Sequence, residues 1–236
     1  MPLLFSPSDR VVAVVAHPDD AEILFFGTLR RWREAGAEVA VVIVTNGANG
    51  VSLTDQADGA RLDAWARPAE SAVSYEGTGI DLECLDLADG SLQPDRHLIS
   101  RIEAALVRLE CTVLLTHPVH DGRDHQDHHA VSRAALNAAA RVPLCTTILH
   151  GQPFGPYQSV NPTVLVDITD HIDAKVKALQ AHGTQSGRYY LGEPFTRHRA
   201  AAAGWDRLPH RAAEGRLFEA LVPSLVLLTD SPERRP

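Results

Sequence analysis

The feature that most constrains this chain is the alternation of short apolar runs with amphipathic stretches. Runs such as Val11–Ala16 and Glu38–Thr45 are dense in Val, Ile and Leu, which is typical of strands buried on both faces. The intervening stretches carry apolar residues at helical spacing. Strands that alternate with helices favour a parallel sheet covered on both sides. We therefore expect an α/β fold with a mostly parallel sheet and helices on both faces.

The same pattern predicts where the elements lie and how the chain is divided. Strands are expected at Val11–Ala16, Glu38–Thr45, Leu82–Asp86, Thr112–Thr116, Thr146–His150 and Thr163–Val166. Helices are expected at Glu22–Ala35, Arg61–Glu76, Asp95–Leu109, Asp127–Ala140 and His171–Ala181, the last capped by Asp170. Residues 1–190 would form the core. Residues 191–236, with helical character at Ala200–Ala203 and Arg211–Leu221, would be a pocket-closing or appended segment of the same domain.

Composition limits the classes of partner. The chain has 236 residues, 30 acidic against 22 basic, and a formal charge of −8, which disfavours nucleic acid and anionic membranes. No basic segment followed by an apolar one opens the chain, and no run reaches the length of a membrane span. The odd number of dispersed cysteines, Cys84, Cys111 and Cys145, predicts reduced thiols. We expect a cytoplasmic protein with a small-molecule substrate, and a homo-oligomer remains open.

Two clusters of Asp and His follow predicted strands. The first is His17-Pro18-Asp19-Asp20, and the second is Asp124-His125-Gln126-Asp127-His128-His129. Because ligands of open α/β sheets gather at the carboxyl ends of strands, we expect the two clusters to meet there. Imidazole and carboxylate ligands suit zinc, although other divalent transition metals accept the same set. The sequence therefore predicts a catalytic metal site with open positions for water and substrate.

Spacing suggests roles for the residues of these clusters. His17 and Asp20 are three residues apart, as are His125 and His128, so each pair can point the same way. Spacing alone does not choose between His125 and His128 as the ligand. Asp19 is the candidate general base, since a carboxylate beside the metal can accept a proton from water. An imidazole off the metal could protonate the leaving amine, and Asp127 could orient an imidazole.

An ordered set of motifs spans roughly residues 10 to 190. The motifs are Ala16-His17-Pro18-Asp19-Asp20-Ala21-Glu22, Gly27-Thr28, Thr45-Asn46-Gly47, Arg67-Pro68-Ala69-Glu70, His125-Gln126-Asp127-His128, Asp167-Ile168-Thr169, and Lys175 to His182 with Gln185. In this order they resemble the PIG-L/LmbE-like zinc-dependent N-deacetylases. The resemblance implies a Rossmann-like fold and hydrolysis of an N-acetyl group on an amino-sugar conjugate or related small metabolite. It also implies the zinc ligands His17, Asp20 and His128.

The resemblance carries further roles onto this chain. It implies Asp19 as the general base and His125, paired with Asp127, as the electrophilic or acid residue. Asn46 and Arg67 would bind substrate. Phe25-Phe26 stands where many members have small glycines, and bulky rings there are expected to narrow the pocket or make it more apolar.

Two other readings compete with a deacetylase. One is a different metal-dependent hydrolase, such as a phosphoesterase or a deaminase; no second carboxylate-rich cluster, P-loop or deaminase pattern supports it. The other is a non-catalytic metal- or ligand-binding protein on the same fold, which would need neither Asp19 nor His125. A chain rich in Ala and Arg, with lysine only at Lys175 and Lys177, also suggests a high-GC genome and a role in secondary metabolism.

Overall fold

The computed structural model describes residues 5–51, 57–155 and 160–227. Its strands form a seven-stranded sheet in the order β3-β2-β1-β4-β5-β7-β6. The strands are β1 (Arg10–Val15), β2 (Glu38–Thr45), β3 (Asp81–Leu87), β4 (Val113–Thr116), β5 (Thr147–Gly151), β6 (Val164–Asp167) and β7 (Phe218–Leu225). Pairing is parallel from β3 through β5, and β7 is antiparallel to both of its neighbours. The expected mostly parallel sheet is confirmed.

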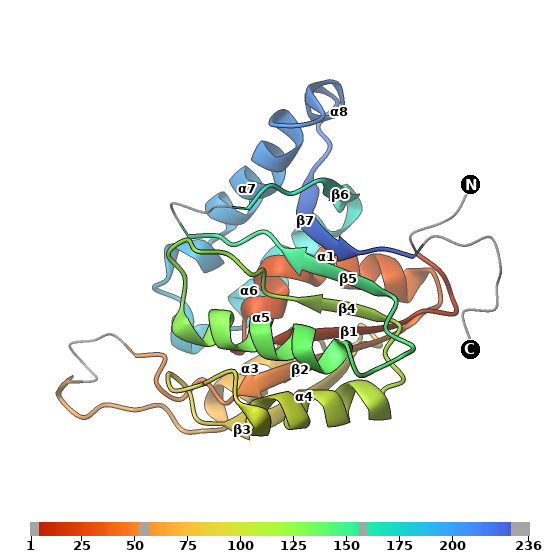
Figure 1. The fold of residues 1–236 in the computed structure, drawn as a ribbon. Coiled ribbons are helices and arrows are strands. Elements are labelled where there is room, and N and C mark those ends of the chain that lie inside the picture. The colour runs from red at the N-terminus through yellow and green to blue at the C-terminus, as the bar shows by residue number, and fades with distance from the viewer. Residues whose placement is uncertain (1–4, 52–56, 156–159, 228–236) are drawn as a thin grey trace.

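Helices cover both faces of this sheet (Figure 1). Helices α4 and α5 lie in front of it in Figure 1, and α1 and α6 lie behind it. The helices are α1 (Asp20–Glu34), α3 (Ala66–Ser74), α4 (Arg96–Arg108), α5 (Gln126–Ala139), α6 (Ile172–Gln180), α7 (Glu193–Trp205) and α8 (Pro209–Ala213). Short 3-10 turns η1 (Thr169–His171), η2 (Gly183–Gln185) and η3 (Tyr189–Leu191) flank α6.

The central strands divide their side chains between two apolar cores. Val11 and Val15 of β1 pack in the core shared with α1 and α6, whereas Val12 and Val14 pack in the core shared with α4 and α5. Alternate residues of a strand point to opposite faces, so an uninterrupted apolar run supplies both cores. This explains why the runs are apolar throughout rather than alternating.

Three expectations from the sequence are wrong. Residues 211–221 are not one helix, because β7 begins at Phe218. Asp170 does not cap α6, whose N-cap is His171 without a side-chain hydrogen bond, since the turn η1 comes between. Phe25 and Phe26 do not narrow a pocket; both are buried in the core between α1 and the sheet.

The topology fixes where a ligand can approach. The chain leaves β1 toward β2 and β3 on one side, and β4 and β5 lie on the other. Such a reversal of strand order opens a crevice at the carboxyl ends of the two central strands, here β1 and β4. His17 follows β1, and His117 follows β4 directly.

Within the described ranges, no helix combines the length and apolar character that crossing a membrane requires.

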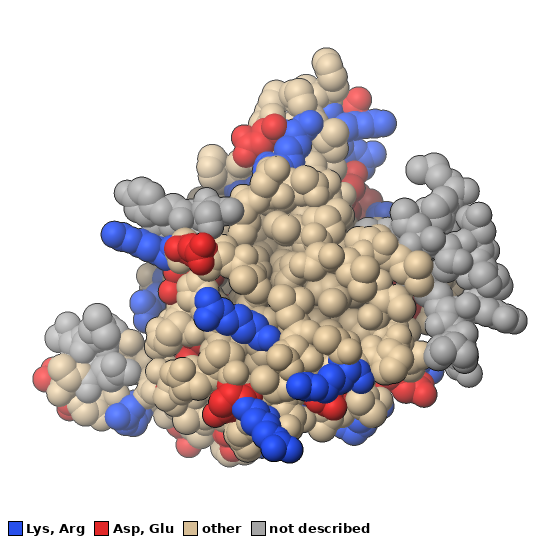
Figure 2. Space-filling view, in the orientation of Figure 1, with Lys and Arg blue, Asp and Glu red and all other residues tan. Residues whose placement is uncertain are grey.

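Cys84, Cys111 and Cys145 are free thiols. On the face drawn in Figure 2, basic and acidic side chains are interspersed around a largely uncharged centre.

Candidate functional site

A pocket of about 750 Å³ opens at the crevice beside β1 and β4. Its lining includes both predicted clusters, which are about a hundred residues apart in the sequence. From the predicted site it contains His17, Asp19, Asp20, Arg67, His125 and His128. The prediction that the two clusters meet at the carboxyl ends of the strands is therefore confirmed.

Three ligand-type side chains converge in this pocket, and all are buried. Nδ1 of His17 lies 3.3 Å from Nε2 of His128 and 3.3 Å from Oδ2 of Asp20. Nε2 of His128 lies 3.2 Å from Oδ1 of Asp20. A tetrahedral zinc ion with bonds of about 2.0–2.1 Å separates its ligand atoms by about 3.3 Å. The two nitrogens are separated by this distance, each lies about as far from one of the two Asp20 oxygens, and one ligand atom from each residue lies within 4.8 Å of the others.

Carboxylates hold the outward nitrogens of both imidazoles. Nε2 of His17 lies 3.3 Å from Asp127 and 3.1 Å from Asp89, and Nδ1 of His128 lies 2.7 Å from Asp124. A neutral imidazole that donates to a carboxylate turns its unprotonated nitrogen the other way. The lone pairs of His17 and His128 then face one another and Asp20, an arrangement that a cation stabilises.

The electrostatics of the site favour a positive charge. Burial acts to lower the pKa of His128, but Asp20 and Asp124 raise it to about 9. Burial likewise opposes the shift at His17, yet hydrogen bonds to Asp127, Asp20 and Asp89 raise its pKa well above the usual value. A metal cation binds the same nitrogen lone pairs as a proton, and the same carboxylates stabilise its charge. The residues present therefore fit a divalent metal.

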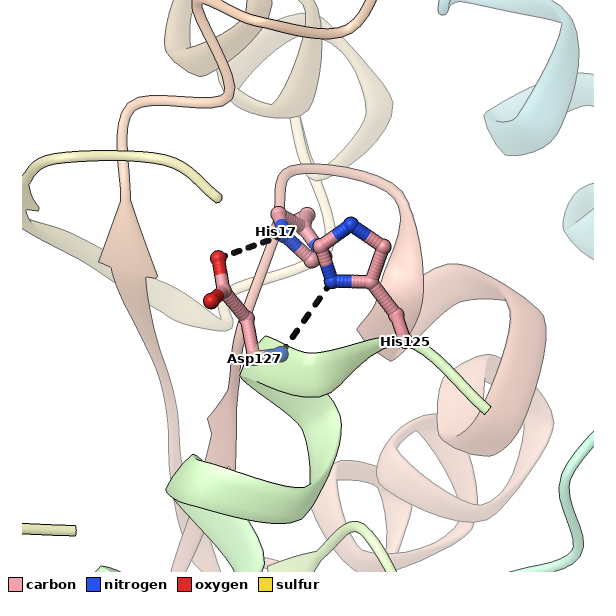
Figure 3. A group of neighbouring side chains, drawn as sticks. All are labelled: His17, His125 and Asp127. Atoms are coloured by element: carbon pink, nitrogen blue, oxygen red, sulfur yellow. Dashed lines mark hydrogen bonds and ion pairs between the residues drawn. The ribbon is translucent and has the colours of Figure 1, made fainter. Parts of the chain in front are cut away.

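A second group of possible ligands, His17, His125 and Asp127, is already hydrogen-bonded (Figure 3). The carboxylate of Asp127 accepts from the backbone N–H groups of Gly90 at 2.7 Å and Leu92 at 3.0 Å. Nδ1 of His125 accepts from the backbone N–H of Asp127 at 3.2 Å and caps α5. The set with Asp20 and His128 therefore suits a metal better.

The pairing of His125 with Asp127 differs from the expected one. The Asp127 carboxylate points toward His17 rather than the His125 ring, and the hydrogen bond between His125 and Asp127 runs from the Asp127 backbone N–H to the His125 ring (Figure 3). Partial burial and the neighbouring imidazoles of His17 and His128 lower the pKa of His125. Since its Nδ1 accepts a hydrogen bond, the proton of the neutral ring is on Nε2.

Asp19 is held in an unusual backbone conformation beside this cluster. Its φ of 109° lies in the region that favours glycine, and such a residue persists only where the surroundings hold it. Arg67 supplies that support, donating to Oδ2 of Asp19 at 3.0 Å and to the carbonyl of Pro18 at 2.6 Å. Burial raises the pKa of Asp19 to about 6 against the influence of Arg67. A carboxylate of that pKa is suited to accept and release a proton near neutral pH.

The remaining predicted residue, Asn46, contacts other parts of the chain. Its amide donates to Asp86 at 2.9 Å and its oxygen accepts from the N–H of Ala48. Asn49, three residues later, lines the pocket. The side chain of Asn46 thus shapes the turn after β2.

Asp89 and His117 complete the site without being among the predicted residues. Asp89 follows β3 in a polar loop, and its only signal in the sequence is its place after a strand. The His117 ring stacks on His128 with centroids 4.2 Å apart, and its Nε2 accepts from the N–H of Ala16 at 3.1 Å. Burial and the charge of His128 lower the pKa of His117 to about 4. His117 is therefore neutral, and its ring packs against His128 without adding charge to the cluster.

Comparison with known proteins agrees with the motif order. Residues 12–139 match the family model PIG-L, described as GlcNAc-PI de-N-acetylase. The diacetylchitobiose deacetylase of Thermococcus kodakarensis is 30% identical over 94% of this chain and 86% of its own length. That identity extends along almost the whole sequence, beyond the residues matched by the family model.

Two solved structures show the shared fold. The 4-carboxy-2-hydroxymuconate hydratase of Pseudomonas putida KT2440 superposes with a TM-score of 0.79 at 20% identity, covering 94% of this chain and 98% of the hydratase. The N,N′-diacetylchitobiose deacetylase of Pyrococcus horikoshii gives 0.72 at 22% identity, covering 91% and 83%. Proteins of this fold thus include both a deacetylase and a hydratase, so activity has to be argued from the site.

Proposed function

This chain belongs to the PIG-L (GlcNAc-PI de-N-acetylase) family, and we propose that it is a metal-dependent N-deacetylase of an amino-sugar conjugate. The observation that carries the proposal is the converging set of His17, Asp20 and His128, with Asp19 and His125 in the same pocket. A binding protein would require the first three residues only. Asp19 and His125 add a proton acceptor and a proton donor, which amide hydrolysis needs.

His17, Asp20 and His128 would hold the metal, which we propose is zinc, although other divalent transition metals suit these ligands. When bound, the ion would lower the pKa of water and polarise the acetamide carbonyl. The outer carboxylates Asp127 and Asp89 hold His17 from behind. Their contribution is to fix the orientation of a ligand rather than to react.

Asp19 would act as the general base. Its carboxylate accepts the proton of the attacking water, and Arg67 keeps it in position by donating to one of its oxygens. Because burial raises the pKa of Asp19 to about 6, the group is a better proton acceptor than an ordinary aspartate and is still ionised at neutral pH.

His125 would serve the leaving group. Its Nε2–H can donate to the carbonyl oxygen or pass a proton to the departing nitrogen, since Nδ1 is occupied by the N–H of Asp127. Water adds to the carbonyl carbon, the C–N bond breaks, and the products are acetate and a free amine. The pocket of about 750 Å³ is large enough for a sugar conjugate.

The setting of the reaction is also a proposal. The three free cysteines agree with a reducing compartment, for which the cytoplasm is our choice. The composition noted above agrees with a tailoring role in secondary metabolism. The substrate that carries the acetyl group would be a small molecule rather than a nucleic acid or a membrane component.

The test is amine release from a panel of N-acetylated amino sugars and their conjugates, using protein of measured zinc content. Asp19→Asn is expected to reduce turnover by about 10²–10⁴-fold with zinc content retained, since only the general base is removed. Asp20→Asn and His128→Ala are expected to lose the metal itself.

His129→Ala is the matched control, because His129 neighbours His128 on α5 and faces the His120 ring instead of the cluster. It should keep both zinc and turnover. If Asp19→Asn retains full activity, the assignment of the base is wrong. If the zinc-loaded wild type cleaves no amide, a non-catalytic binding protein becomes the better description.

A further inference from the structure

One arginine of the pocket is not needed by the chemistry above. We propose that Arg188, together with Tyr190 and Phe154, forms a subsite for an anionic group, carboxylate or phosphate, in the part of the substrate beyond the acetamide. The proposal rests on the proposed function, since it concerns the substrate of the same pocket. It assigns to this chain a preference for acidic amino-sugar conjugates.

The pocket contains two arginines, and only one of them is already paired. The guanidinium of Arg67 donates to Asp19, to the carbonyl of Pro18 and to the carbonyl of Gly47. Arg188 also lines the pocket, yet its guanidinium has no hydrogen bond or ion pair with any residue of the described ranges 5–51, 57–155 and 160–227. A guanidinium has five N–H donors in a planar fork that matches carboxylate and phosphate oxygens.

The pocket acids do not compete for Arg188. Asp20, Asp89 and Asp124 each lie within 3.4 Å of an imidazole nitrogen, and Asp19 is paired with Arg67. A half-buried cation without a partner inside a pocket has lost part of its hydration, and an incoming anion restores the lost interactions. A charge-assisted bidentate pair is stronger than a neutral hydrogen bond and also fixes orientation.

Two aromatic rings line the same pocket as Arg188. The rings of Phe154 and Tyr190 lie with centroids 4.7 Å apart, and both residues line the pocket. They offer an apolar surface for the face of a sugar ring. Burial raises the pKa of Tyr190 to about 12, so its hydroxyl remains a donor at neutral pH.

The segment that carries Arg188 and Tyr190 is fastened to the body of the protein. The side chain of Gln185 donates to the carbonyl of Gly50 at 2.8 Å, and Thr184 binds Glu70 through both its N–H and its hydroxyl at 2.7 Å. Just before them, the buried His182 contacts Glu22 at 2.9 Å. Because these contacts hold the segment, little ordering is needed when an anion binds Arg188.

The experiment compares substrates that differ only in charge. We would use the N-acetylglucosaminide of glycolic acid and its neutral amide, each as both anomers, with N-acetylglucosamine 1-phosphate as the phosphate probe. Wild type should prefer an acidic probe over the amide, and which acid it prefers distinguishes carboxylate from phosphate. Arg188→Gln should raise KM for the acid about tenfold or more while kcat and the KM of the amide change less than twofold.

Arg188→Lys should recover part of the preference, because it keeps the charge but loses the fork. Arg197→Gln is the matched control: this exposed arginine of α7 pairs with Glu193 and Asp173 and should leave both substrates unaffected. Equal losses on the acid and the amide in Arg188→Gln, or equal KM values in wild type, would overturn the subsite.

Failure of the subsite and failure of the proposed function can be told apart. Calorimetric binding of the same acid and amide to the Asp19→Asn protein reads the subsite without turnover. If the acid binds more tightly than the amide, and Arg188→Gln abolishes this preference, the subsite is supported even where no amide is cleaved. Equal binding of both probes would reject the subsite even where deacetylation is observed.

Discussion

At the scale of single residues, the site consists of ligand-type side chains and the carboxylates that orient them. The ligand-type residues stand in compact motifs after strands, so the sequence predicted their meeting. Asp89 could not be found in this way, because it is one aspartate in a polar loop and its contact with His17 exists only once β3 and β1 share a sheet. Phe25 and Phe26 show the converse error. They lie close to a motif in the sequence, but this did not reveal that α1 turns both rings into the core.

The role of Asp127 as an orienting residue leads to a prediction about metal affinity. Its carboxylate contacts Nε2 of His17 at 3.3 Å and two backbone N–H groups. In Asp127→Asn the amide cannot supply the same acceptors, so the ring of His17 is less firmly held. We expect zinc affinity to fall about 10–100-fold, measured by competition with a chromophoric chelator. His129→Ala should not change the affinity; an unchanged affinity in Asp127→Asn would contradict the orienting role.

His182 gives a pH-dependent contribution to stability. Burial acts to lower its pKa, but the contact with Glu22 raises it above 6.5. A raised folded-state pKa means that the protonated form is stabilised in the folded protein. The contribution is therefore complete below the unfolded value of about 6.5 and is lost as pH rises through the folded-state pKa.

The corresponding measurement is urea unfolding of wild type and His182→Gln across a pH series. We expect the difference in unfolding free energy between them to be largest near pH 6 and to shrink toward pH 9. Some difference should remain, because a neutral His182 still donates to Glu22. A difference that is constant with pH would show that folding does not change the pKa of His182, and would contradict this prediction.

At the scale of elements, the strands of the parallel part were predictable and β7 was not. Runs such as Glu38–Thr45 are apolar because both faces are buried, and this signal is local to each strand. In β7 the polar Glu219 interrupts the apolar residues, and the segment before it forms the helix α8. The reason for a buried glutamate lies in residues far away in the sequence.

Glu219 joins β7 to the middle of α1. Its carboxylate accepts from the N–H groups of Gly27 at 3.0 Å and Thr28 at 2.7 Å, and from Lys175 at 2.6 Å. Lys175 in turn donates to the carbonyl of Ile23 at 2.8 Å, the group that an unbroken helix would bond to the N–H of Gly27. The ion pair is thus inserted into the hydrogen-bond ladder of α1.

Removing one member of this buried pair should be costly. Glu219→Gln leaves the Lys175 ammonium uncompensated, and we expect a loss of about 3–5 kcal/mol in unfolding free energy, measured by denaturant titration. The double change Glu219→Gln with Lys175→Met should recover part of the loss. Glu214→Gln breaks only an exposed pair with Arg211 and should cost less than about 1 kcal/mol. Equal effects of the two single changes would contradict the inserted pair.

At the scale of the whole molecule, the question is whether residues 1–190 can fold without β7. This strand lies between β5 and β6 in the sheet. Without it, the pairing of β6 with β7 is lost and β5 is left as an open edge. We therefore expect a chain ending at residue 190 to lack the cooperative unfolding transition of the full chain, measured by circular dichroism during thermal or urea unfolding.

A graded test within the intact chain separates packing by β7 from the general effect of truncation. Leu221 is fully buried in the core between α1 and the sheet, whereas Leu225 at the end of the same strand is 48% exposed. Leu221→Ala should cost about 2–5 kcal/mol in unfolding free energy, since it leaves a cavity in that core. Leu225→Ala should cost clearly less, because water already reaches its side chain. If the two substitutions have equal effects and the chain of residues 1–190 unfolds cooperatively, the strand is an appendage to a core that is complete without it.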